Sequence, residues 1–167
     1  REAGVQIDGD AKINLVGLGD YPRLDRRFPG SFGSAYMYFA VPRVILFREE
    51  HSRRTLVEKV DFISAPGKSA PNVWRQGGPK ALVTGRCVFS FDGERFRLDS
   101  VHPGHSVDEV VENTGFAFDC PAEVGETPLP DPQRLALLRG EIAGRVAEFY
   151  PEFAARVFGG PSRQARG

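Results

Sequence analysis

The chain has 167 residues, of which 41% are hydrophobic, so it is long enough to bury a substantial core. Its 22 basic and 22 acidic residues cancel, so no overall field attracts nucleic acid or an anionic membrane, and neither is expected as a partner. No apolar run approaches the roughly 20 residues of a membrane span, and no signal-peptide pattern is present. Cys87 and Cys120 form no ligand-spaced cluster with histidine, which disfavours zinc and predicts reduced, mostly buried thiols in a cytoplasmic protein.

The first half of the chain alternates β-forming segments with glycine- and proline-containing loops. A glycine-punctuated loop precedes a short helical segment, and Pro42 then ends that helix. Four consecutive apolar residues follow and predict a compact buried strand. The predicted segments are two short strands within residues 5–18, a loop at 20–27, the glycine loop at 28–35, a helix at 35–40, a buried strand at 44–47, an exposed turn at 48–54, a strand or extended element at 57–63 and a long loop at 65–79.

The second half carries the clearest secondary-structure patterns. A β-hairpin is predicted from residues 81–91 and 95–101, because both arms alternate apolar and polar residues around Asp92-Gly93. Ser106 and Glu109 form a capping-box pattern for a helix that ends at Asn113. After a proline-rich linker at 121–132, a long helix begins near Asp131-Pro132 and breaks at Tyr150-Pro151, and a short helix then reaches Phe158. The long helix has one apolar face, formed by Leu135, Leu138, Ile142 and Val146.

These segments predict an α/β fold with an open mixed sheet and flanking helices. We expect one domain over residues 1–158 and a mobile tail over residues 159–167. The chain begins at Arg1 rather than Met and runs quickly into β-forming sequence, so we expect further sequence upstream.

Five stretches, taken in order, resemble the β-type subunits of family I CoA-transferases of the glutaconate CoA-transferase kind. Each stretch alone is weakly specific, but their order over most of the chain is strongly so. Asp10-Ala11-Lys12 departs from the family pattern, which has a Gly-Asn pair at that turn. The stretches are Val5-Gln6-Ile7-Asp8 with Ile13-Asn14, the loop from Phe28 to Ser34, His51 to Arg54 with Val57 to Ile63, Gly77-Gly78-Pro79 with Val83-Thr84, and His102-Pro103-Gly104 with Thr114-Gly115-Phe116.

The resemblance implies a CoA-transferase family I β-subunit-like fold whose N-terminal part lies outside this chain. It also implies a heterodimer or heterotetramer with an α-type CoA-transferase subunit, a coenzyme A thioester as cosubstrate and no bound cofactor. In this family a glutamate attacks the thioester and then carries coenzyme A as a glutamyl thioester. That glutamate lies in an ExG-type motif upstream of the matched region, and Glu2 stands too close to the first matched stretch to be its counterpart.

The glycine loop is the main candidate site. Attack on a thioester develops negative charge on the carbonyl oxygen, which backbone N–H groups can stabilise, and glycine allows close approach. Gly33 is assigned as the backbone donor, and a helix starting after it would add its positive end. The alternatives are a simple strand-to-helix turn and serines that cap the helix. The substrate-binding candidates are Pro29, Gly30, Ser31, Phe32, Ser34, Gly77 and Gly78.

The three histidines receive no catalytic role. His51 is expected to be a solvated loop residue, His102 a structural hydrogen-bonding residue and His105 an exposed one. Arg75, in the long loop, is expected to reach substrate or a partner subunit. Three functions stay open: a CoA-transferase subunit, a hydrolase subunit that opens a ring on a CoA thioester, and a non-catalytic partner subunit.

Overall fold

The computed structural model describes residues 5–159, and the chain divides into two compact units, residues 1–127 and 128–167. The single domain predicted over residues 1–158 spans both units. Of the predicted tail, Gly159 follows the last helix in a left-handed conformation, with φ of 61°, and residues 160–167 lie outside the described part.

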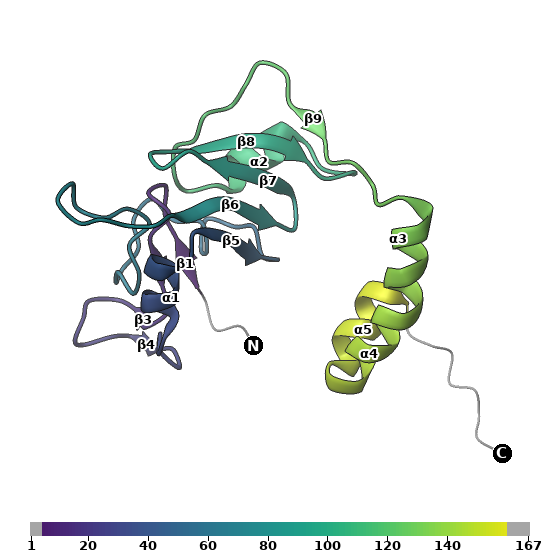
Figure 1. Cartoon of the computed structure of the whole chain (residues 1–167), viewed down its shortest axis with the longest axis horizontal. Helices are drawn as coiled ribbons and strands as arrows, with labels where there is room; N and C mark the ends of the chain where they lie inside the picture. Colours follow the sequence, from purple (N-terminus) through teal and green to yellow (C-terminus); the bar gives the residue numbers. More distant parts are fainter. Residues whose placement is uncertain (1–4, 160–167) are drawn as a thin grey trace. The chain divides into compact units, whose positions relative to one another are not determined.

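The first unit is built on a five-stranded mixed sheet, which confirms the predicted fold class (Figure 1). The strands lie in the order β5 (Arg43–Arg48), β6 (Gly78–Thr84), β7 (Cys87–Phe91), β8 (Phe96–Val101) and β9 (Gly125–Glu126). The outer pairs β5–β6 and β8–β9 are parallel, whereas β6, β7 and β8 run antiparallel. The chain crosses from β5 to β6 through the long loop, so that loop returns to the edge of the sheet where β5 lies.

The β7–β8 hairpin forms where the alternating pattern predicts it. Phe91 pairs with Phe96 across the turn, and Gly93 has a φ of 107°, a conformation that favours glycine. The arm predicted as one strand over residues 81–91 is instead two strands, because the chain turns between Thr84 and Cys87 and β6 pairs with β7.

One face of the sheet packs on the core. Phe89 is fully buried at its centre and lies against the rings of Phe96, Phe116 and Phe118. Helix α2 (Val107–Asn113) covers this side with Val110, and the predicted capping box between Ser106 and Glu109 is present. The apolar face predicted for the two hairpin arms is therefore the buried face of the sheet.

The amino-terminal segments form two small antiparallel pairs. β1 (Gln6–Ile7) pairs with β2 (Ile13–Asn14), as predicted, and β3 (Gly17–Leu18) pairs with β4 (Arg26–Arg27). The loop predicted over residues 20–27 therefore ends in a short strand. The strand considered for residues 57–63 is absent, because that stretch consists of bends that continue from one bridge between Ile7 and Leu56.

Helix α1 (Ser34–Ala40) agrees with the helix predicted at 35–40. The prediction of a buried strand at 44–47 is correct in position and wrong in burial. Ile45 is 67% exposed and Phe47 73% exposed, because β5 lies at the edge of the sheet and no described element of the first unit covers that face. The cysteine prediction is half correct, since Cys87 is buried and Cys120 is exposed.

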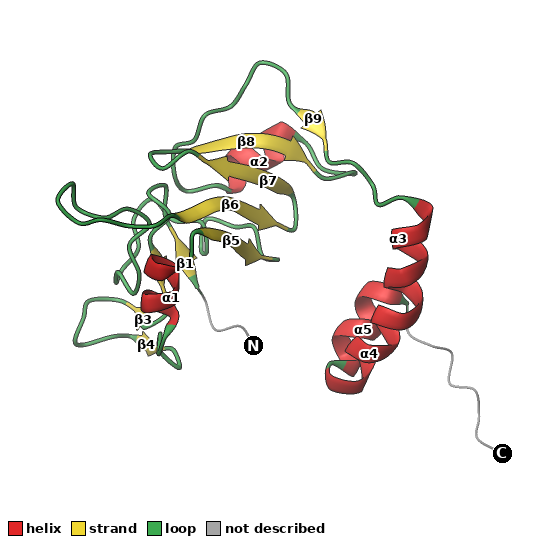
Figure 2. Ribbon diagram, in the orientation of Figure 1, coloured by secondary structure: helices red, strands yellow, loops and turns green. Residues whose placement is uncertain are grey.

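The second unit is helical (Figure 2). Asp131 caps the predicted long helix, which consists of α3 (Pro132–Leu137), a π-helical turn η1 (Leu138–Ile142) and α4 (Ala143–Phe149), and α5 (Pro151–Phe158) follows. The four residues of the predicted apolar face are half-buried, as expected. None of the helices in the described part of the chain has the length and apolar character needed to cross a membrane.

Candidate functional site

The glycine loop, defined as residues 28–34, is held at both ends by buried aromatic residues. Before it, Phe28 is buried and its N–H donates to the Val16 carbonyl at 2.9 Å. After it, the Tyr38 hydroxyl donates to the Ala11 carbonyl at 2.7 Å, and burial raises the pKa of the phenol above its ordinary value. The loop is therefore fixed to the turns between the amino-terminal strands, while Phe32 and Gly33 in its middle are exposed.

The backbone of the glycine loop departs from ordinary conformations at two positions. Gly30 has a φ of 107° and Phe32 a φ of 38°, a region that residues with side chains seldom adopt. Phe32 also exposes 90% of its side chain, so no packing explains its strained backbone. Within residues 5–159, the N–H groups of residues 30–33 donate no hydrogen bond, which leaves a row of free donors on an exposed turn.

Gly33 lies at the junction of the loop and α1. Its φ of −80° is ordinary for any residue, and a Cβ atom built on it meets nothing within 4 Å. The first turn of α1 receives no side-chain capping bond, so the interpretation of Ser31 or Ser34 as a cap is wrong. The Ser34 N–H instead donates to the Ser31 carbonyl at 2.7 Å and closes the turn. No property of the fold therefore requires glycine at position 33.

Arg75 ties the long loop to α1 rather than reaching outward. Its guanidinium donates to the carbonyls of Pro66 and Gly67, each at 2.9 Å, and to the Tyr38 carbonyl. It also lies over the rings of Tyr38 and Phe39, 5.3 and 5.8 Å from their centroids. Arg75 thereby connects the long loop to the helix that follows the glycine loop, which corrects the expectation that it is free to reach a ligand.

Replacing Arg75 with Gln is expected to release the long loop. The variant loses charge-assisted bonds, each of which contributes about 1.5–3 kcal/mol. Chymotryptic cleavage after Trp74, which is 77% exposed, should become at least about tenfold faster. Arg97→Gln is the control, because Arg97 is an exposed arginine of β8 and should leave the cleavage rate unchanged. Equal rates in both variants would show that Arg75 does not hold the loop.

Gly77 and Gly78 have packing reasons for being glycine. A Cβ atom on Gly77 would lie 1.9 Å from the Pro42 carbonyl oxygen, and Gly78 has a φ of 140°. The Gly78 N–H donates to that same carbonyl at 3.2 Å. These two residues bring the end of the long loop beside the start of β5, so the structure places them at this junction and not in the glycine loop.

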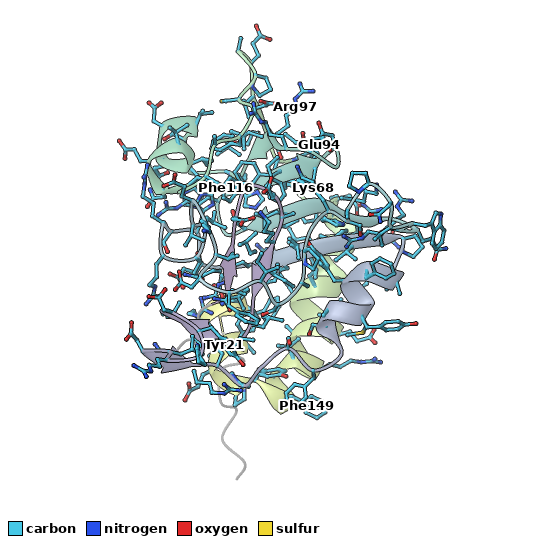
Figure 3. The ribbon with its side chains drawn as sticks, turned by 90° about the vertical axis from the view of Figure 1, so that its left-hand side faces the viewer. Tyr21, Lys68, Glu94, Arg97, Phe116 and Phe149 are labelled. Carbon is cyan, nitrogen blue, oxygen red and sulfur yellow. The ribbon has the colours of Figure 1, made fainter. Side chains whose placement is uncertain are left out.

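A cavity of about 660 Å³ lies elsewhere in the unit and contains none of the predicted site residues. Figure 3 shows Lys68, Glu94 and Phe116 on this side of the molecule. Lys68 lies 2.9 Å from Glu94 and 3.3 Å from Asp10, and Lys12 lies 2.6 Å from Asp10. Because carboxylates already neutralise these lysines, the cavity has less attraction for an anionic ligand than its size alone suggests.

His51 is buried, so the expectation of a solvated loop residue is wrong. Its Nδ1 lies 2.8 Å from the Thr84 hydroxyl, and its Nε2 lies 3.0 Å from the Thr114 hydroxyl. Burial, and then the nearby Arg86 charge, lower the pKa of His51 to about 4. The neutral ring thus joins β6 to the segment after α2. A lone histidine among charged residues carries no periodic signal that would reveal this role.

The other two histidines agree with their predictions. His102 bonds the Thr127 hydroxyl through Nδ1 at 2.8 Å and the Thr84 carbonyl through Nε2 at 3.0 Å, as a structural residue would. His105 is exposed and contacts Glu109 at 3.1 Å. Burial raises the pKa of the Cys87 thiol to about 11, so that buried thiol is a poor nucleophile.

Comparison with known proteins identifies the class to which this fold and loop belong. A family model described as Coenzyme A transferase matches residues 1–113. The β subunit of glutaconate CoA-transferase from Acidaminococcus fermentans is 31% identical over 154 residues, covering 83% of this chain and 54% of that protein. The chain therefore belongs to the coenzyme A transferase family. Within it, the chain has the sequence of a family I β-type subunit, as the five motif stretches indicate.

Two other relatives have similar identities and different names. The β subunit of 3-oxoadipate CoA-transferase from Pseudomonas knackmussii is 31% identical over 142 residues, covering 80% of this chain and 54% of that protein. The IpdB subunit of the cholesterol ring-cleaving hydrolase from Rhodococcus jostii is 29% identical over 140 residues, covering 80% of this chain and 55% of that protein. The chain thus spans about half the length of the curated relatives that it matches.

Solved structures agree with these matches. The crystal structure of glutaconate coenzyme A-transferase from Acidaminococcus fermentans has a TM-score of 0.75 at 31% identity, covering 86% of this chain and 58% of that one. The crystal structure of Rhodococcus jostii IpdAB has a TM-score of 0.74 at 29% identity, covering 81% of this chain and 56% of that chain. The described fold is accordingly that of a family I CoA-transferase subunit.

Proposed function

We propose that the chain is the β-type subunit of a two-subunit enzyme that transfers coenzyme A between a short-chain acyl-CoA and a carboxylic acid. The observation that carries this proposal is the glycine loop of a coenzyme A transferase family member, whose free N–H groups lie on a strained and exposed turn. The names of two relatives, each one subunit of a CoA-transferase, support an α-type partner subunit.

In the proposed reaction, a glutamate supplied by polypeptide outside the described residues attacks the thioester carbonyl. The carbon–sulfur bond breaks, coenzyme A leaves as a thiolate, and an acyl-glutamyl anhydride forms. The thiolate then attacks the glutamyl carbonyl, releases the first carboxylate and leaves coenzyme A on the glutamate as a thioester. The second carboxylate then attacks the glutamyl thioester, so that the coenzyme A thiolate leaves and a new anhydride forms. The thiolate attacks the acyl carbonyl of that anhydride, which gives the new acyl-CoA and frees the glutamate.

The role proposed for the loop is to stabilise the oxyanion of each tetrahedral intermediate. Gly33 contributes a backbone N–H, and the open space at its Cβ position lets the thioester approach the main chain. Pro29, Gly30, Ser31, Phe32 and Ser34 line the path of the acyl group in this proposal. Gly77 and Gly78 contribute by placing the end of the long loop beside β5.

A covalent adduct on glutamate tests the proposal. The complete enzyme is incubated with acyl-CoA and then with borohydride, which reduces a glutamyl thioester. Mass spectrometry should find the modified glutamate outside this chain, because the reactive carboxylate must face the glycine loop and the glutamates after that loop belong to other parts of the fold. The described glutamates lie on other elements: Glu50 pairs with Arg48, Glu94 with Lys68, and Glu109 caps α2.

Other outcomes of this experiment select among the alternatives. An adduct on Glu2, which lies outside the described residues, would place the nucleophile in this chain. A hydrolase subunit is the second candidate, since IpdB and IpdAB resemble the chain nearly as well as the transferase does. That function predicts no adduct, with product still forming from a CoA thioester and water. An intact complex that shows neither reaction would indicate a non-catalytic subunit.

A further inference from the structure

Helix α1, which follows the glycine loop, has few of the features that stabilise a short helix by itself. It spans seven residues, and helices of that length are marginal in water without tertiary contacts. Within residues 33–40, all of which the structure describes, the N-cap makes no side-chain capping bond, the first turn has no acidic residue and the last turn has no basic one. Contacts from other parts of the chain therefore hold α1 in place.

One carbonyl at the carboxyl end of α1 lacks its usual donor. In an α-helix each carbonyl accepts from the N–H group four residues further on. The residue four positions after Tyr38 is Pro42, which has no N–H. The guanidinium of Arg75 donates to the Tyr38 carbonyl instead, and it lies over the Tyr38 ring, 5.3 Å from the centroid. Arg75 therefore supplies both a donor and a positive charge to this end of the helix.

The long loop and the turn between β1 and β2 fix the position of Arg75. Its Nη1 donates to the carbonyls of Pro66 and Gly67, each at 2.9 Å. Gly67 packs closely on the turn, because a Cβ atom on it would lie 2.7 Å from the Ala11 carbonyl oxygen. The Tyr38 hydroxyl donates to that same carbonyl at 2.7 Å. The guanidinium thus joins α1 to a loop that is itself packed against the amino-terminal strands.

The glycine loop and the first turn of α1 share their hydrogen bonds. The Met37 N–H donates to the Gly33 carbonyl at 3.0 Å, and the Ser34 N–H donates to the Ser31 carbonyl at 2.7 Å. A shift or fraying of α1 therefore moves Gly33. In other enzymes a displacement of about 1 Å caused by a distant substitution can reduce the rate about 100-fold. The position of this helix therefore matters for any reaction that uses the Gly33 N–H.

We propose that Arg75 is a positioning residue for the oxyanion donor of the glycine loop. It holds the carboxyl end of α1 and thereby keeps the Gly33 N–H directed at the thioester carbonyl, without touching the substrate itself. This role of Arg75 rests on the donor role proposed above for Gly33. Because Arg75 acts through Gly33, its loss should matter only while the Gly33 donor is in use.

A double-mutant cycle on the complete enzyme tests whether Arg75 acts through Gly33. Arg75→Gln should lower kcat about tenfold and change the KM for acyl-CoA less than about threefold, because a misdirected donor weakens the transition state more than the bound substrate. In a Gly33→Val background the same substitution should change kcat less than about twofold, since that donor is already blocked. Arg75→Lys keeps a charged donor and should recover part of kcat. Arg97→Gln, an exposed arginine of β8, is the control and should leave kcat unchanged.

Hydrogen exchange in the complete enzyme tests the hold on the helix separately. The Val41 amide donates to the Met37 carbonyl at 2.9 Å at the end of α1. Arg75→Gln should speed exchange of this amide at least about fivefold, whereas Arg97→Gln should not change it. Unchanged exchange in Arg75→Gln overturns the inference. An equal loss of kcat with and without Gly33→Val also overturns it, because a purely structural role of Arg75 would act in both backgrounds.

The same experiments separate failure of this inference from failure of the proposed function. Transfer of coenzyme A with multiplicative effects of the two substitutions rejects the positioning role alone. Hydrolysis of the thioester without transfer rejects the proposed function alone, and the cycle is then measured on hydrolysis, whose oxyanion forms at the same carbonyl. A complex that catalyses neither reaction rejects both.

Discussion

Gly33→Val is expected to reduce turnover of the complete enzyme by about 100- to 1,000-fold and to leave the chain folded. The fold tolerates the change because Gly33 has an ordinary φ of −80° and a Cβ atom at this position meets nothing within 4 Å. The proposed chemistry does not tolerate it, because the side chain fills the position from which the thioester carbonyl reaches the backbone donor. Loss of one oxyanion donor has an effect of this size in other enzymes.

The measurement is steady-state turnover of the complex, with urea unfolding of the chain as the check on stability. Gly125→Val is the matched control, since Gly125 also has open space around its Cβ position but lies in β9. The control should keep wild-type turnover, and Gly33→Ala should fall between the two. If the Gly33→Val enzyme is folded and fully active, Gly33 is only a turn residue and does not act as an oxyanion donor.

Acidification is expected to destabilise the chain through His51. In the folded state the pKa of His51 is about 4, against about 6.5 for an unperturbed histidine. Above pH 6.5 both folded and unfolded states carry a neutral ring, and this residue contributes no pH dependence. As the pH falls below 6.5 the unfolded state takes up a proton and the folded state does not, so stability decreases until about pH 4.

The expected loss attributable to His51 is about 2 kcal/mol between pH 7.5 and pH 5, and roughly 3 kcal/mol once the pH is below 4. Urea unfolding at both pH values measures it, and His51→Gln should remove this component because glutamine does not titrate. His105→Gln is the control, since that histidine is exposed and its loss should leave the acid dependence intact. Identical pH dependence in wild type and His51→Gln would mean that the ring is protonated in the folded chain.

Local patterns predicted the elements whose causes are local. The β7–β8 hairpin, the capping box of α2 and the start of α3 at Asp131-Pro132 follow from turn residues and capping side chains that act within a few positions. The motif stretches likewise predicted the family. For the candidate site, the loop itself was predictable because glycine and serine mark it in the sequence.

The surroundings of that loop were not predictable in the same way. Arg75 lies nine residues from Pro66 and 37 from Tyr38, and no local pattern specifies which carbonyl groups a long side chain will reach. The burial of His51 depends on Thr84 and Thr114, which are 33 and 63 residues away. Contacts at such distances form only when the sheet and α2 assemble.

By itself, then, the sequence determined the family, the mixed α/β class and the position of the glycine loop, since each follows from residue order and local conformational preference. Tertiary structure alone decided that Gly33 is free of packing constraints, that His51 is a neutral buried link and that β5 lies at the edge of the sheet. The physical reason is that burial and edge position are properties of neighbouring chain. An apolar run such as that of β5 specifies that a cover is needed, without specifying which polypeptide provides it.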